Sequence, residues 1–157
     1  MPKLTDNGKM TLTIDGISMS TPAWKILNLH VLKQPAPQRG SDRLIPGSSG
    51  VIPYRRRNTV AVHSLQMLIS GTHDRTGTNN DDRVQQLLTN VDYLNYQVVY
   101  PPGTGDGTRA AVLTTSGQLV PLTADIHVLG MEFGEVSLDS TWMKAVLEIS
   151  IPAGEFT

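Results

Sequence analysis

Few side chains in this sequence could carry out acid–base or metal chemistry, and they are widely spaced. Four histidines occur, and of these only His73 has an acidic neighbour, Asp74. A metal site needs several converging ligands, and a chain without cysteine can supply no thiolate ligand. We therefore interpret His73-Asp74 as an ordinary polar loop, and we predict no metal site and no bound cofactor.

Carboxylates near the C-terminus could form an acid–base pair of the kind used by glycosidases. The candidates are Glu132, Glu135 and Glu148, with His127 close to them in sequence. No Gly-x-Ser-x-Gly elbow is present to support a serine hydrolase. We expect these side chains to point outward from half-exposed strands, and we predict no catalytic residue. A small β-fold hydrolase that uses Glu132, Glu135 or His127 is kept as an alternative.

Two other features could bind a ligand. The stretch 103–107 is glycine-rich, but it lacks the lysine and the following helix of a phosphate-binding loop, so we interpret it as a flexible turn. A carbohydrate-binding module would need exposed aromatic residues, and aromatic residues make up only 5% of the chain. Trp24 and Trp142 lie in expected strands, and we expect both in the core.

The most distinctive segment runs from Arg39 to Gly50 and continues to Arg57. The stretch 33–57 carries six basic residues against Asp42 alone, whereas the whole chain has a net charge of −1. Clustered arginines can bind phosphates, but no aromatic platform beyond Tyr54 accompanies them. We favour contact with acidic residues of a neighbouring subunit over contact with nucleic acid. The predicted subunit-interface residues are Arg39, Gly40, Arg43, Pro46, Gly47, Tyr54, Arg55, Arg56 and Arg57.

Composition points to one domain with an unusual surface. The chain has 157 residues, enough for one core, and 17% are charged, below the ~25% of average soluble domains. A surface poor in charge suggests that a partner covers part of it. No stretch approaches the ~18 uninterrupted apolar residues of a membrane helix, and the N-terminus lacks the apolar core of a signal peptide. We expect no membrane partner and synthesis in the cytoplasm.

Period-two alternation predicts a mainly β fold, a β-sandwich or barrel. We expect 1–157 to form a single domain, with an extended loop at about 32–58 that serves as an inter-subunit arm. Strands are expected at 10–14, 24–31, 59–69, 96–100, 109–114, 118–122, 124–137 and 142–151.

One amphipathic helix is expected at about 80–95, packed on the sheet. Its outer face includes Asn90, and both Leu87 and Leu88 should be buried. The apolar stripe at helical spacing consists of Val84, Leu87, Leu88, Val91 and Leu94.

The order of these features resembles a known family. An Arg-Gly-x-x-Arg-x-Ile-Pro-Gly-x-x-Gly stretch at 39–50 follows an early strand pair. A long strand that ends in Ile-Ser-Gly at 69–71 and a helix with Leu87-Leu88 come next. This arrangement, over roughly residues 10–151, resembles the small tail proteins of long-tailed bacteriophages, in the superfamily of tail-tube and distal-tail proteins.

The resemblance implies a structural protein of the virion tail without enzymatic activity. Members assemble as hexameric rings around a channel through which DNA passes as transient cargo, and long loops clasp the next subunit or ring. It therefore implies other copies of this chain and neighbouring tail proteins as partners. Distal-tail proteins often carry an added C-terminal domain, whereas the printed sequence ends soon after its last expected strand. A tube, minor or distal tail, terminator or head-to-tail connector role thus stays open.

Overall fold

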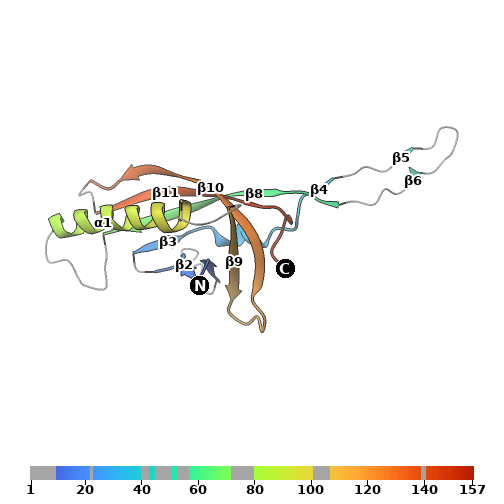
Figure 1. The fold of residues 1–157 in the computed structure, drawn as a ribbon, viewed down its shortest axis with the longest axis horizontal. Helices are drawn as coiled ribbons and strands as arrows, with labels where there is room; N and C mark the ends of the chain where they lie inside the picture. The colour runs from blue at the N-terminus through green and yellow to red at the C-terminus, as the bar shows by residue number, and fades with distance from the viewer. Residues whose placement is uncertain are drawn as a thin grey trace, which may run out of the picture.

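The computed structural model describes residues 10–21, 23–39, 43–44, 51–52, 57–71, 80–100, 107–138 and 141–157 (Figure 1). These residues form strands, one long helix and two short helical segments. In chain order the elements are β1 (Met10–Ile14), β2 (Ile17–Ser18), β3 (Trp24–Ile26), the 3-10 helix η2 (Leu29–Lys33), β4 (Gln38–Arg39), β5 (Arg43–Leu44), β6 (Val51–Ile52), β7 (Arg57–Asn58), β8 (Ala61–Ser70), α1 (Asn80–Leu94), the π-helix η3 (Asn95–Val99), β9 (Thr108–Thr115), β10 (Leu122–Val136) and β11 (Trp142–Ile151).

The main sheet has seven antiparallel strands in the order β2-β1-β9-β10-β11-β8-β3. Its longest strand, β10, changes partner along its length. Residues 122–127 pair with β9, and residues 127–136 pair with β11 through two register shifts. The bend of β10 therefore joins a β1–β9 half of the sheet to a β11–β8–β3 half (Figure 1).

Both halves of the sheet bury one face in a common core. The core faces of β1 and β9 include Leu12 and Leu113, and those of β8 and β11 include Leu65 and Leu147, all fully buried. The period-two alternation predicted for residues 142–151 is confirmed, since Ala145, Leu147, Ile149 and Ile151 are buried. The mainly β prediction is confirmed. Among the described strands the sheet is open, because no ladder joins its edge strands β2 and β3.

The predicted helix is also confirmed, and its axis runs along the sheet (Figure 1). Leu87 and Leu94 are buried against the sheet, and Tyr93 stacks on Trp24 of β3 with ring centroids 5.5 Å apart. Gly71 makes this close approach possible, because a Cβ there would lie 2.1 Å from the Arg83 carbonyl oxygen. No described helix has the length and apolar character that crossing a membrane requires.

The contact face of the helix is narrower than the sequence predicts. Leu88 is 60% exposed, so the expectation that it is buried is wrong. Asn90, expected outside, is instead buried: its amide donates a 2.7 Å hydrogen bond to the Ser70 carbonyl oxygen at the end of β8. A polar side chain can occupy this core position because the strand end offers it a hydrogen-bond acceptor.

Three predicted strands are wrong. Residues 118–121 form no strand, their apolar residues Leu119 and Val120 are exposed, and only Leu122 belongs to β10. Residues 24–31 form a three-residue strand and then η2, in which Leu29 and Leu32 are buried at a spacing that fits 3-10 geometry. Residues 96–100 continue the helix as η3, with Val98 and Val99 buried. In the latter two segments adjacent apolar residues are compatible with a strand or a tight helix, and packing decides between them.

Candidate assembly surfaces

The segment predicted as an arm, at about 32–58, contains two short antiparallel strand pairs and is not loop alone. β4 pairs with β7, and β5 pairs with β6. Figure 1 shows both pairs beyond one end of the main sheet, with β5 and β6 farthest from it. A ladder at the base of the arm directs the chain away from the sheet and back to it.

Arg39 and Arg57 face each other across the base of the arm. They are direct partners in the β4–β7 register, and both are exposed. Directly opposed side chains have Cβ atoms about 4.5–5.5 Å apart, and like charges in such pairs destabilise the ladder. No ion pair with either arginine occurs in the described part of the chain. The base of the arm therefore presents two cations on one face of a ribbon.

The other predicted interface residues are only partly within the described structure. Arg43 lies in β5, where the backbone alone is described. Six predicted interface residues lie outside the described residues: Gly40, Pro46, Gly47, Tyr54, Arg55 and Arg56.

The C-terminal segment holds the base of the arm in place. The Glu155 carboxylate accepts hydrogen bonds from the Ala36 backbone N–H at 3.2 Å and the Asn58 amide at 3.5 Å. Gly154 has φ +89°, and a Cβ there would lie 2.5 Å from the Thr59 carbonyl oxygen. The chain entering the arm and the chain leaving it thus converge on one C-terminal turn.

A shallow apolar groove of about 480 Å³ lies on the outer face of the sheet. Trp142, which the sequence predicts in the core, is 41% exposed and forms part of its wall, so that prediction is wrong. The reason is register: Trp142 pairs with Ser70 on the face opposite the core pair Met143 and Ile69. The groove is lined by Leu27, Leu68, Ile69, Ser70, Trp142 and Lys144.

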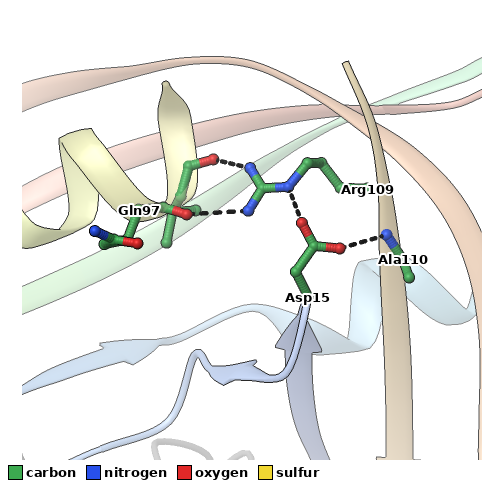
Figure 2. Close-up of polar contacts among 5 residues, drawn as sticks. Asp15, Gln97, Arg109 and Ala110 are labelled. Carbon is green, nitrogen blue, oxygen red and sulfur yellow. Dashed lines mark hydrogen bonds and ion pairs between the residues drawn. The ribbon is translucent and has the colours of Figure 1, made fainter. Parts of the chain in front are cut away.

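A buried arginine, which sequence reasoning did not single out, fixes the helix to the sheet (Figure 2). Arg109 on β9 is 2% exposed and pairs with the carboxylate of Asp15 in the β1–β2 turn. Its other guanidinium nitrogens donate to the carbonyl oxygens of Val98 and, at 3.0 Å, of Gln97. A cation is well placed here, because the last carbonyls of a helix lack intrahelical donors and carry negative partial charge.

The environment of Asp15 favours its charged form. Burial disfavours the charge, but the Arg109 hydrogen bond, the Ala110 backbone N–H at 2.9 Å and the guanidinium charge outweigh it and lower the Asp15 pKa. The sequence did contain a signal for this site. Arg109 shares the core face of β9 with Ala111 and Leu113 at period two, and an arginine on a core face requires partners.

The histidine considered for catalysis does not converge with Glu132 or Glu135. Glu132 and Glu135 are exposed on β10, Glu148 is exposed on β11 opposite Gly130, and His127 is half-buried five positions before Glu132. Along a strand that separation is about 16 Å, too far for joint acid–base work. Among the described residues no cluster of three histidine or acidic side chains could hold a metal ion. His73 and Asp74, and residues 103–106 of the glycine-rich stretch, lie outside the described residues.

Neither a protein-family model nor a curated protein matches the sequence. Solved structures do match the fold. The Dit (gp 19.1) protein of phage SPP1, described as a paradigm of the hub adsorption apparatus of phages that infect Gram-positive bacteria, aligns with a TM-score of 0.56 and 13% identity, over 92% of this chain and 50% of that one.

The activated baseplate of phage p2 gives two further matches. The structure with Sr has a TM-score of 0.51 at 11% identity, and the structure with Ca has 0.50 at 12% identity. These cover 93% and 92% of this chain and 44% of the matched chains. The chain thus spans about half the length, or slightly less, of the proteins it matches. The resemblance expected from the sequence is confirmed at the level of the fold.

Proposed function

We propose that this chain is a structural component of a phage tail that assembles with copies of itself into a ring, expected to be hexameric, around the channel that DNA crosses. The observation that carries this proposal is the fold shared with SPP1 Dit and the p2 baseplate protein over more than nine-tenths of the chain. One match is described as a paradigm of a phage hub adsorption apparatus, and the other is part of a phage baseplate. The proposed location is therefore the virion tail, at its distal or baseplate end, with neighbouring tail proteins as further partners.

Features of the surface favour an assembled protein over a monomer. The outer sheet face has an apolar groove, and the arm extends from one end of the protomer. Large apolar side chains remain exposed on the helix and on β10, including Leu88, Phe133 and Val136. Exposed apolar surface of this kind is typical of proteins that bury it against a partner. A hydrolase that pairs His127 with Glu132 or Glu135 would require these side chains to converge, which they do not.

The sites proposed for subunit contact are the arm residues. Arg39 and Arg57 lie exposed at its base, and Gly40, Arg43, Pro46, Gly47, Tyr54, Arg55 and Arg56 complete the proposed set. Guanidinium groups suit this task, because they bind carboxylates bidentately and remain charged at any physiological pH.

Mass measurement of the purified chain tests the proposal. Size-exclusion chromatography with light scattering over a concentration series, followed by negative-stain microscopy, should show a closed ring of one copy number. A chain that remains monomeric at the highest attainable concentration, both alone and with the adjacent tail proteins, would contradict it. A closed ring that binds the tube end but not the baseplate would favour a terminator or connector position instead.

A further inference from the structure

The far half of β10 is an open edge of the sheet. Residues 127–136 pair with β11 on one side, while β9 covers the other side only as far as residue 127. Within the described chain no strand pairs with the second side of residues 129–136. Because backbone groups of a strand alternate between its two sides, about four residues there direct N–H and C=O groups outward. Such an edge is a template for a strand from another chain.

This edge carries two carboxylates on one face of the strand, and the same stretch also exposes large apolar side chains. Glu132 pairs with Val146, and Glu135 reaches Lys144 at 3.5 Å; since Lys144 and Val146 share a face of β11, both carboxylates lie on the same face. The Glu135–Lys144 pair is exposed on both sides and therefore weak. Three large apolar side chains of the same stretch are exposed: Leu129 at 53%, Phe133 at 40% and Val136 at 49%.

The base of the arm has the opposite charge and lies at the opposite end of the protomer. β8 begins at Ala61, three residues after the β4–β7 ribbon ends, and its last residue, Ser70, pairs with Trp142. Val136 of β10 lies at that distal end, since it pairs with Met143 and Met143 pairs with Ile69. Glu132 pairs with Val146 and is therefore level with Gln66, nine residues after Arg57, which is about 30 Å of extended chain. Arg39 and Arg57 therefore cannot reach the β10 edge of their own chain.

We infer that the β4–β7 ribbon of one copy docks on the open edge of β10 of the next copy, with Arg39 and Arg57 on the carboxylates of Glu132 and Glu135. This inference rests on the proposed function and adds the surface that receives the arm. Two cations on one face of a ribbon meet two anions on one face of a strand, which relieves the like-charge pairing within the ribbon. The contact is head to tail, so repetition of it closes a ring or extends a filament.

The inference is tested by reversing the charges of the β10 edge and of the β4–β7 ribbon, first separately and then in the same chain. Glu132→Arg with Glu135→Arg should weaken self-association by ~10-fold or more, because like charges then face each other across the contact. Arg39→Glu with Arg57→Glu should do the same. A chain that carries all four changes should recover assembly to within ~3-fold of the wild type, since the charge pattern is then exchanged rather than lost.

Matched controls separate this contact from a general charge effect. Asp92→Arg on the exposed face of α1 matches the sign of the glutamate reversals, and Arg83→Glu on the same helix matches that of the arginine reversals. Both positions are exposed and lie outside the two surfaces, so association should be unchanged. Circular dichroism on every variant should show an unaltered fold. If the wild type forms rings and the reversed variants do so equally well, the inference is overturned and the proposed function stands. A wild type that never associates overturns both.

Site-specific crosslinking gives a second readout that does not depend on affinity. The chain has no cysteine, so a variant with Arg57→Cys and Glu132→Cys carries only the two engineered thiols. Treated with a short bifunctional maleimide, it should give a ladder of covalent oligomers. Each single-cysteine variant should stop at a dimer or below. A double variant that gives no ladder while its rings remain visible by microscopy would overturn the inference.

Discussion

Arg109 and Asp15 form an ion pair at the point where the helix ends on the sheet, and the same guanidinium binds the carbonyl oxygens of Gln97 and Val98. One side chain thereby ties together the β1–β2 turn, strand β9 and the end of η3 (Figure 2). No disulfide holds the helix at this position, because the chain has no cysteine. Its packing through Leu87 and Leu94 and its anchoring by Arg109 together keep it on the core.

Arg109→Ala should therefore destabilise the protomer strongly. Removing the cation leaves two helix-end carbonyls without their donor, whereas the Asp15 carboxylate is 37% exposed and can bind water, so the free energy of unfolding should fall by ~1.5–3 kcal/mol. Urea denaturation measures it. Arg83→Ala on the exposed face of α1 is the control and should change stability by less than ~0.5 kcal/mol. Equal stability of the two variants would show that Arg109 does not anchor the helix.

The same pair predicts a pH dependence. The folded pKa of Asp15 is below its ordinary value of 3.8, so the unfolded chain binds the proton more readily. The contribution of Asp15 is fully present above pH 3.8 and is lost as the pH falls through the lower folded pKa. Asp15→Asn should be less stable than the wild type at neutral pH and should show a smaller further loss between about pH 5 and pH 2. Parallel slopes for the two chains would rule out this role.

The helix surface allows a comparison of adjacent leucines. Leu87 is 4% exposed and Leu88 is 60% exposed. Leu87→Ala should lower the free energy of unfolding by ~2–5 kcal/mol, because it leaves a cavity under the helix. Leu88→Ala should change stability by less than ~0.5 kcal/mol, since its side chain contacts solvent in the protomer. Thermal melts of both variants check this, and similar losses would mean that the helix face is assigned wrongly.

How far the sequence predicts this structure depends on whether local pattern or tertiary context decides each element. Period-two alternation is enough to locate β8 and β11, and the stripe from Val84 to Leu94 is enough to locate α1. Residues 24–31 and 96–100 fail because adjacent apolar residues do not distinguish a strand from a tight helix, and contacts with the core settle the matter.

The site is less predictable than the fold. The basic excess of the arm is evident in the sequence, but the opposition of Arg39 and Arg57 is a property of register. The open edge of β10 follows from where β9 ends relative to β11, which no local pattern encodes. Trp142 shows the same dependence: a strand residue faces the core or solvent according to its partner, here Ser70.

Gly154 should resist substitution because of both its backbone and its neighbours. It has φ +89°, and a Cβ would lie 2.5 Å from the Thr59 carbonyl oxygen and 2.7 Å from the Ala36 Cβ. Gly117 has nearly the same conformation, φ +88°, and a Cβ there would meet nothing within 4 Å, so it is a matched control. Gly117→Ala should reduce stability by ~1–2 kcal/mol through backbone strain alone. Gly154→Ala should lower the melting temperature further, because the base of the arm must also shift. Equal losses for the two variants would show that Thr59 and Ala36 can move aside at little cost.

The arm should be dispensable for folding and required for assembly. Gln38 pairs with Asn58 in the β4–β7 register, so replacing residues 39–57 with Asn-Gly joins this pair by a two-residue hairpin turn without moving the base. The hydrogen bonds of Glu155 to Ala36 and Asn58 remain, and no residue of the core cluster is removed. The shortened chain should keep the circular dichroism spectrum and melting temperature of the wild type within a few degrees, yet elute as a monomer where the wild type forms rings. A shortened chain that unfolds would show that the arm belongs to the core, and one that still forms rings would show that subunit contact lies elsewhere.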